Sequence, residues 1–446
     1  MANRERWRSK IAFVLAAAGS AVGIGNIWRF PYIVGNNGGG AFVLVYLACI
    51  SCIGIPLLMV ELFIGARSQA GAVKAFEIVH QPRSPWRWLG HLCWMTSFII
   101  LSFYCVIGGW ILDFLQLALR GQLAHDDPQT VRGILQQLFA SPTRQIAWHA
   151  VFTAVNAAVM ACGFKKGLER AGLWLMPALV VILLLLLLHA LFLPGVGQAL
   201  TFLFRPDTSR LTAAGMLEAV GHSFFTLSIA MGIMLTYGSY LRGDESLGRL
   251  ALSIALFDTL IALLVGIVIF SVAFSFGVET GTGPTLIFQT LPVLFAKLTG
   301  GWFVSTLFFL LVAFAALTSS LSLFELLVSL STEMLGVGRK AAAFGVALSA
   351  FTLGIVSALS TNVLASWTLY GKTPFDLLDW VTSSLFLPVS GICFALFFGW
   401  VLGRPAVRQL LGERLGQSAV GAIFLWTVRV LVPGAICIVW VRGLLP

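Results

Sequence analysis

Apolar runs of about 20 residues recur along the whole chain and are separated by short polar or basic segments. A helix of that length rises far enough to cross the hydrocarbon core of a bilayer. The pattern therefore predicts an all-α polytopic membrane protein with about eleven transmembrane helices. We expect these helices near residues 11–33, 41–65, 88–119, 146–163, 168–194, 213–240, 248–276, 300–335, 341–360, 376–402 and 418–441.

The composition agrees with the pattern. Of the 446 residues, 59% are hydrophobic and only 10% are charged, which excludes an ordinary soluble domain. The net charge of +10 comes from Lys and Arg clustered before the first span and in alternate connections. By the positive-inside rule these segments face the cytoplasm, so we expect a cytoplasmic N-terminus. No basic patch with interleaved aromatic residues indicates a nucleic-acid partner.

The N-terminal segment and the cysteines give two further expectations. The basic residues Arg4, Arg6, Arg8 and Lys10 lead directly into a full-length span, so we expect no cleavable signal peptide. The seven cysteines lie mostly within predicted spans, and no pair has the spacing of metal ligands. We interpret them as small buried hydrophobic residues.

Two of the predicted spans are interrupted. Residues Ala18–Pro31 carry three glycines, an Asn, an Arg and a Pro, and Gly221–Gly232 mixes hydroxyls with small residues. Backbone groups freed inside a membrane are costly unless protein or a ligand satisfies them. Either interruption alone also fits ordinary helix packing through small residues. Interruptions in equivalent positions of two halves indicate an inverted-repeat transporter with a midplane site.

We therefore expect one transporter domain over residues 1–446. Its first half-repeat covers about 11–194, its second about 213–402, and an additional helix covers about 418–441.

Five motifs, in order along nearly the whole chain, carry a family resemblance. They are Gly23–Pro31, Asn37–Phe42, Gly54–Leu57 followed by Glu61, Phe224–Ser228 and Leu317–Ser320. With these motifs the chain resembles the neurotransmitter:sodium symporter family, in particular its bacterial amino-acid transporters with the leucine-transporter fold. The resemblance implies a multi-pass protein of the bacterial inner membrane that imports an amino acid with sodium. Many members have a twelfth span that this chain lacks, which leaves open whether it forms a homodimer.

The resemblance implies two sodium ions and no organic cofactor. One ion would be bound by the carbonyl oxygens of Gly19, Val22 and Ala315 and by the hydroxyls of Thr318 and Ser319. Without residues opposite them, the two hydroxyls would more simply bond their own helix.

The second sodium ion would be bound by oxygens of Ala21 and Thr226, by the Asn26 side chain, by the substrate carboxylate and by a residue of the seventh span. Asp258 stands there in place of the family's usual Asn. An ionisable group inside a span indicates function, although an Asp that only joins helices is the alternative. Relatives use chloride or a more distant carboxylate to balance charge, whereas this chain has Ala262 and His222 at the usual anion-site positions. We therefore expect Asp258 to supply the charge and transport to be independent of chloride.

The resemblance also implies a substrate pocket. The amides of Ile24 and Gly25 and the hydroxyl of Tyr104 would bind the substrate carboxylate, because a half-helix N-terminus attracts anions. The α-amino group would meet the carbonyls of Ala21, Phe225 and Thr226 and the hydroxyl of Ser228. The residues facing the substrate side chain would be Ser20, Ile100, Phe225, Ala230, Met231, Ser319 and Leu323.

This lining carries no charge, so a neutral and fairly hydrophobic amino acid is expected. Gly23 stands where monoamine carriers of the family have an Asp, which again favours a true amino acid. One methylene is worth only about 1–3 kcal/mol in such a pocket, so the lining does not select among leucine, methionine and an aromatic residue.

Gates are expected at both ends of the pathway. Arg29 and Asp379 match the family's outer ion pair, with Tyr104 and Phe225 as an inner lid. Arg4 and Glu333, with Trp7 and Tyr240 beside them, match its cytoplasmic pair, although Asp is usual at position 333. In span five, Gly167 and Pro177 resemble a motif that lets the helix unwind.

Three other functions can be compared with the sequence. Proton coupling or proton antiport would use Asp258 and His222 as titrating groups. A nutrient receptor that binds without transport would not need gates. A membrane enzyme is disfavoured because no nucleophile in the pocket has a base and an orienting group beside it.

Overall fold

The computed structural model describes residues 5–125, 127–241, 245–278 and 286–444. In this part of the chain every named element is helical and no strand occurs. The helices of the first half are α1 (Lys10–Ala21), α2 (Phe30–Asn36), α3 (Gly40–Cys49), α4 (Ile55–Ser68), α5 (Ala72–Val79), α6 (Arg87–Leu119), α7 (Pro128–Ala140), α8 (Pro142–Ala161), α9 (Arg170–Ala190) and α10 (Val196–Phe204).

The remaining helices are α11 (Ala213–Thr226), α12 (Ile233–Gly238), α13 (Leu247–Ser275), α14 (Leu291–Ala296), α15 (Gly301–Leu335), α16 (Arg339–Ala358), α17 (Pro374–Val381), α18 (Leu387–Leu396), α19 (Gly403–Leu411), α20 (Glu413–Gly416), α21 (Ala419–Trp426) and α22 (Val432–Leu444). Short π-helical segments join several of them, among them Gly25–Arg29, Phe397–Leu402 and Thr427–Leu431.

Eight of the described helices are long and apolar enough to cross a membrane, and the pair Lys10–Ala21 and Gly25–Asn36, bent by 52°, is a ninth candidate. The expected count of eleven is therefore not confirmed. The other two expected spans correspond to α8, which carries Arg144, His149 and Asn156, and to α11 with α12, which are two short halves. Polar residues and a break reduce the apolar length of each.

The two interruptions expected from the sequence are real breaks. The first helix stops at Ala21, because Val22 turns to an extended conformation (φ −71°, ψ 90°). The sixth span stops at Thr226 and resumes at Ile233. Between them Ser228 (φ 52°), Ala230 (φ 68°) and Gly232 (φ 78°) are left-handed, a conformation that costs energy for the first two residues.

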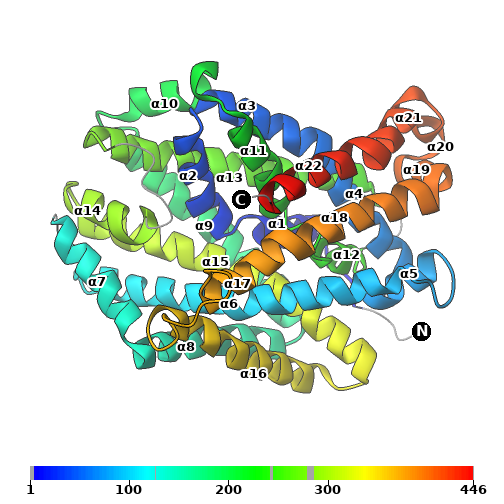
Figure 1. Ribbon diagram of the computed structural model, residues 1–446, viewed down its shortest axis with the longest axis horizontal. Coiled ribbons are helices and arrows are strands. Elements are labelled where there is room, and N and C mark those ends of the chain that lie inside the picture. Colours follow the sequence, from blue (N-terminus) through cyan, green and yellow to red (C-terminus); the bar gives the residue numbers. More distant parts are fainter. Residues whose placement is uncertain (1–4, 126, 242–244, 279–285, 445–446) are drawn as a thin grey trace.

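The long helices α6 and α15 pack side by side and form the centre of the bundle, with α8 and α16 against them (Figure 1). The broken helices lie across this centre. Close packing of α4 on α12 depends on Gly65, where a Cβ would lie 2.0 Å from the carbonyl oxygen of Leu235. The broken span is thus held against intact helices by direct backbone contact.

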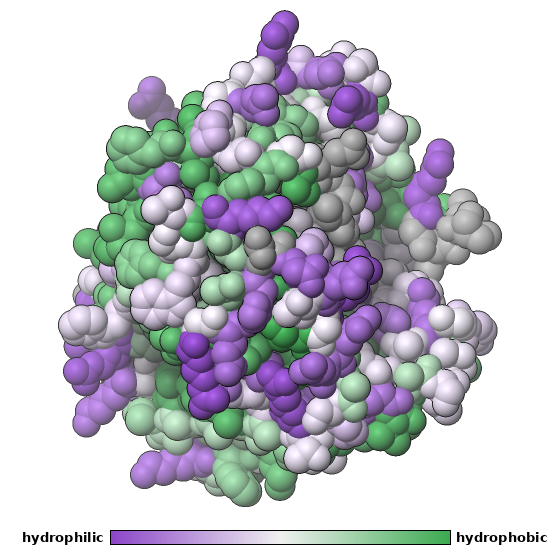
Figure 2. Space-filling view, turned by 90° about the vertical axis from the view of Figure 1, so that its left-hand side faces the viewer, coloured by the Kyte–Doolittle hydropathy of each residue, from purple (hydrophilic) through white to green (hydrophobic). Residues whose placement is uncertain are grey.

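The end of the molecule that carries α7, α10 and α14 faces the viewer in Figure 2, and hydrophilic side chains gather toward the middle of this face. Such a face meets water rather than lipid. The opposite end, at the right of Figure 1, carries α5, α19 and α20. Of the cysteines, Cys49, Cys93 and Cys105 are buried, whereas Cys52 and Cys162 are exposed, so our interpretation of buried cysteines is wrong for these two.

Candidate functional site

A small pocket lies at the centre of the bundle, where both breaks meet α6 and α15. Its volume is about 40 Å³, close to the space of a single water molecule, so an amino acid needs side chains to move. Ala230 is the only expected pocket residue that does not line it, and Gly23 and Ile233 are added. The lining residues are Ser20, Ala21, Gly23, Ile24, Gly25, Ile100, Tyr104, Phe225, Thr226, Ser228, Met231, Ile233, Ser319 and Leu323.

Two features of this pocket favour a ligand with polar groups. The hydroxyl of Tyr104 is buried and has no hydrogen-bond partner among the described residues. A buried donor without a partner is costly, so a bound molecule that accepts this hydrogen bond gains free energy. At Gly23 a Cβ would lie 2.6 Å from Ser319 Oγ and 3.4 Å from the Tyr104 hydroxyl, so the glycine keeps this space open.

Oxygens of the first break converge on α15 beside the pocket. The hydroxyl of Ser319 donates to the carbonyl oxygen of Ser20 (3.1 Å) and lies 3.4 Å and 3.5 Å from those of Gly19 and Val22. The hydroxyl of Thr318 donates to the carbonyls of its own helix at Phe314 (3.0 Å) and Ala315 (3.1 Å). We call the set Gly19, Val22, Ala315, Thr318 and Ser319, which was expected to bind one sodium ion, the neutral-oxygen site. Its carbonyl and hydroxyl oxygens are all uncharged, and oxygens are the ligands that hard cations take.

A second group of oxygens surrounds Asp258 on α13, whose side chain is fully buried. Its carboxylate accepts hydrogen bonds from Asn26 Nδ2 (2.8 Å) and from Thr226 Oγ1 (2.9 Å). The Asn26 amide oxygen in turn accepts from the backbone N–H of Gly23 (3.3 Å). We call Asp258, Asn26, Thr226 and Ala21 the carboxylate site. It joins both broken helices to α13.

His222 lies one turn before Thr226 on α11 and is fully buried. Its ring stacks on Phe30 (5.9 Å between centroids) and tilts against Tyr46 (5.3 Å). Neither ring nitrogen has a hydrogen-bond partner among the described residues. His222 therefore lies in an aromatic contact beside the carboxylate site, and its ring nitrogens form no hydrogen bond to the described residues of that site.

The left-handed turn between α11 and α12 is stabilised by hydrogen bonds from residues of other helices. A carboxylate oxygen of Glu61, fully buried on α4, accepts a hydrogen bond from the backbone N–H of Ala230. The hydroxyl of Ser97 on α6 donates to the carbonyl oxygen of Met231 (3.1 Å), and that of Ser228 donates to the carbonyl oxygen of Ser20 (2.8 Å). These bonds offset the cost of the strained backbone. Sequence reasoning missed this role of Glu61, although a carboxylate inside a span was the signal.

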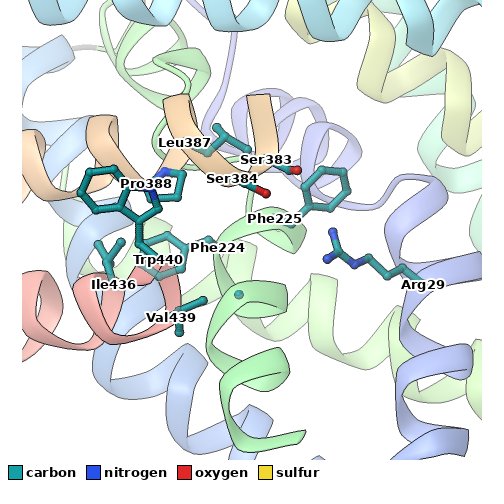
Figure 3. A pocket seen from close by; sticks show the side chains of 11 residues that line it. Arg29, Phe224, Phe225, Ser383, Ser384, Leu387, Pro388, Ile436, Val439 and Trp440 are labelled. Atoms are coloured by element: carbon teal, nitrogen blue, oxygen red, sulfur yellow. The ribbon is translucent and has the colours of Figure 1, made fainter. Parts of the chain in front are cut away.

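A larger pocket of about 200 Å³ adjoins the central one, and Phe225 lines both. Figure 3 shows the guanidinium of Arg29 pointing toward Phe225, with the serines of the segment before α18 opposite and side chains of α22 beyond. Arg29 lies 5.3 Å from the centroid of the Phe225 ring. The expected pair with Asp379 does not form here, since no ion pair within 4.0 Å joins them in the described chain. Asp379 and Glu218 act on the guanidinium only from a longer distance.

The structure describes three members of the expected cytoplasmic gate, Trp7, Tyr240 and Glu333. Arg4 lies outside the described residues. Glu333 accepts from the backbone N–H of Gly71 (2.7 Å) and pairs with Lys74 (3.6 Å). Trp7 packs against Tyr240 (6.3 Å between rings) and donates from Nε1 to the carbonyl oxygen of Tyr237 (3.1 Å).

A buried ion pair that sequence reasoning missed lies beside this gate. Glu325 of α15, fully buried, pairs with Arg339 of α16 and accepts a hydrogen bond from the Tyr240 hydroxyl (2.7 Å). The signal was again an acidic residue within a predicted span. The end of α12 is thus tied to two intact helices.

Comparison with known proteins finds relatives over nearly the whole chain. The model of the sodium:neurotransmitter symporter family matches residues 4–133 and 134–445. An uncharacterised sodium-dependent transporter of Bacillus subtilis is 38% identical over 445 residues, which cover 98% of this chain and 97% of that protein. A sodium-dependent neutral amino acid transporter of Rattus norvegicus, B(0)AT3, is 30% identical over 60% of this chain and 48% of its own length.

A solved structure agrees with these relatives. The crystal structure of MhsT in complex with L-phenylalanine superposes with a TM-score of 0.89, at 41% sequence identity, over 99% of this chain and 100% of that one.

Proposed function

The chain belongs to the sodium:neurotransmitter symporter family, and from this premise we propose that it couples sodium entry to the uptake of a neutral, hydrophobic amino acid by alternating access. Membership confirms the expected family, the helical membrane fold of the MhsT type and the assignment to transporters rather than enzymes. The convergence of both helix breaks on one small pocket is the observation that carries the proposal.

The substrate class is supported by the pocket and by two relatives. No lining residue carries a charged side chain, so an acidic or basic substrate would lose hydration without compensation. MhsT was solved with L-phenylalanine, and B(0)AT3 is named as a neutral amino acid transporter. The flexible Met231 side chain suits apolar side chains of different shape.

We infer these roles for the pocket atoms. The Tyr104 hydroxyl and the amides of Ile24 and Gly25 bind the substrate carboxylate. The carbonyl oxygens of Ala21, Phe225 and Thr226 and the hydroxyl of Ser228 bind its ammonium group.

Sodium is cargo in this scheme. One ion binds at the neutral-oxygen site and a second at the carboxylate site, where the substrate carboxylate completes the set of oxygens. The first ion would hold the broken helix against α15 and the second would hold both broken helices against α13, so ion binding favours closure around the substrate.

Chloride independence follows from the charge at Asp258. Its carboxylate lies within hydrogen-bond distance of Asn26 and Thr226, so a cation there meets a fixed negative charge. Chloride would add a second negative charge beside it and be repelled. A cytoplasmic N-terminus follows from the positive-inside pattern. Inward transport follows from coupling to sodium entry.

Uptake into proteoliposomes tests the function. Purified protein is reconstituted, and uptake of radiolabelled neutral, acidic and basic amino acids is followed under an inward sodium gradient, with choline as the control cation and gluconate replacing chloride. We expect uptake of hydrophobic amino acids only with sodium, and equally in gluconate. Uptake driven by a proton gradient in choline would support proton coupling instead. Sodium-dependent binding without accumulation would support a receptor.

A further inference from the structure

One arginine lies inside a span without an acidic partner. Arg429 belongs to the π-helical segment Thr427–Leu431, within the candidate span Ala419–Arg442. In the described chain it has no carboxylate oxygen within 4.0 Å. An unpaired charge inside a membrane is costly and marks function by default.

The guanidinium is held in a fixed place rather than left free to reach water. Its Nε donates to the carbonyl oxygen of Gly399 (2.6 Å), and its carbon lies 5.1 Å from the centroid of the Trp400 ring. Trp400 Nε1 donates back to the carbonyl oxygen of Arg429 (3.3 Å). The terminal nitrogens of Arg429 have no hydrogen-bond partner among the described residues, so they remain available.

Glycines make room for this arrangement. A Cβ at Gly399 would lie 2.8 Å from Cγ of Arg429, and one at Gly403 would lie 3.4 Å from its Nη2. Two π-helical segments, Phe397–Leu402 and Thr427–Leu431, meet here. Such segments are frequent at functional sites because they displace side chains from the regular helical register.

The surroundings resemble the boundary between lipid tails and headgroups. Exposed apolar side chains flank Arg429 on its own hairpin: Ile423 (64% exposed), Trp426 (56%) and Val430 (47%). Trp400 is itself 61% exposed, as expected of an aromatic anchor at a membrane interface. Phe397, in the same segment as Trp400, packs on Phe76 of α5, so this level lies near α5, at the end of the bundle opposite α7 and α14 (Figure 1).

The connecting hairpin adds positive charge. Between Gly399 and Arg429 the chain has three arginines and one glutamate, and the glutamate, Glu413, accepts a hydrogen bond from Gln417 (2.7 Å). Arg404 and Arg408 are exposed and follow Gly403 on α19. A phosphate at Arg429 would therefore lie in a net positive field with apolar surfaces on either side.

We propose that Arg429, Trp400 and the start of α19 form a binding site for the phosphate headgroup of an anionic phospholipid. The guanidinium donates to the phosphate oxygens, Trp400 holds the guanidinium plane, and the acyl chains extend into the membrane along the exposed apolar side chains Ile438 and Val441 of α22. A free phosphate ion would meet the same donors but leave this apolar face uncovered. The site is independent of the transported substrate.

Thermal stability of the purified full-length protein in maltoside detergent tests the site. Phosphatidylglycerol or phosphatidylcholine is titrated at equal concentrations, and the melting temperature is recorded. We expect phosphatidylglycerol to raise the melting temperature of the wild type more than phosphatidylcholine does. Arg429→Gln keeps a donor for Gly399 but removes the charge, and it should need about fivefold more phosphatidylglycerol for the same shift.

Two further variants and one competitor complete the test. Arg442→Gln lies on the same helix about 20 Å away and should behave as wild type. Trp400→Leu keeps the charge but removes the stacking and should weaken the lipid effect about threefold, which keeps the proposal testable if Arg429→Gln does not fold. An unchanged lipid response in Arg429→Gln, or an equal response to glycerol 3-phosphate without acyl chains, would overturn the proposal.

Discussion

The neutral-oxygen site and the carboxylate site lie on the same broken helix, yet they are built from different chemistry. The first uses carbonyls and hydroxyls, and Ser319 alone faces three carbonyl oxygens within 3.5 Å. The second places one formal charge, Asp258, between Asn26 and Thr226. A cation at the first site depends on the number of oxygens in place, whereas at the second it depends mainly on charge.

This difference explains how the two sites connect to the bundle. The neutral-oxygen site joins the first break to α15 alone. A cation can bind there only when the first broken helix contacts α15. The carboxylate site joins α1, α11 and α13. A cation can bind there only when both broken helices contact α13. Loss of one site should therefore impair transport in a different way from loss of the other. Variants of each site distinguish the two defects.

Loss of the neutral-oxygen site should have the largest effect. In Thr318→Val with Ser319→Ala two oxygen ligands disappear, and hydrogen-bond partners of charged groups are worth about 1.5–3 kcal/mol each. Sodium-driven uptake should fall at least about 100-fold in the proteoliposome assay. Ser320→Ala is the matched control, because that hydroxyl bonds Asn156 (2.7 Å) and lies outside the site. Equal uptake by the double variant and the control would remove the site from the mechanism.

Neutralising the carboxylate site should have the next largest effect. Asp258→Asn should lower the apparent sodium affinity about tenfold, because a fixed charge is lost in a poorly solvated place. Uptake by this variant should become stimulated by chloride, measured as the ratio of rates in chloride and gluconate.

A charge exchange sharpens this prediction. Asn26→Asp with Asp258→Asn moves the carboxylate across a contact of 2.8 Å and keeps the total charge. The double variant should again ignore chloride. If wild type itself requires chloride, or if Asp258→Asn keeps its sodium affinity, Asp258 only joins helices.

Arg29 lies outside both cation sites, so its substitution should affect sodium binding at the two sites equally. Arg29→Gln removes the cation that lies over Phe225, a contact worth about 0.5–2 kcal/mol, and should lower flux about fivefold. Binding of the amino acid, measured by scintillation proximity, should change less than flux, because the contact acts on closure. A charge-swapped Arg29→Asp with Asp379→Arg protein restores flux only if the two residues pair in another conformation. Normal flux in both variants would make Arg29 an anchor.

The smallest effect should come from the pocket wall. Met231→Leu conserves volume, so its melting temperature should stay within a few degrees, since such changes cost under about 1.5 kcal/mol. Preference between phenylalanine and leucine should shift about tenfold, while the sodium dependence of both sites stays unchanged. A shift in sodium affinity would show that the substrate wall and the cation sites are not separable.

Much of the fold could be predicted because apolar length is a local property. The span expected at 88–119 is α6 (Arg87–Leu119), and the one expected at 300–335 is α15 (Gly301–Leu335). The connecting helices α7 and α10 were missed, since short amphipathic helices outside the membrane lack that signal. The half-repeat boundaries stay a prediction.

The candidate site was predictable only through its motifs. Nothing in local periodicity tells that Asn26 meets Asp258, which lies 232 residues away. Ala230 was misplaced because its left-handed conformation turns the side chain away from the direction that a helix would give it. The Glu325 pair with Arg339 was missed because a buried charge reveals its partner only in three dimensions.

The fastening of the turn between α11 and α12 has a consequence for how substrate range evolves. The bonds from Glu61 and Ser97 go to the main chain at positions 230 and 231, so no side chain there is needed to keep the turn folded. A single codon change at Met231 can therefore reshape the pocket without first destabilising its frame. A lineage with this turn can acquire new substrates in small steps, each through a functional protein.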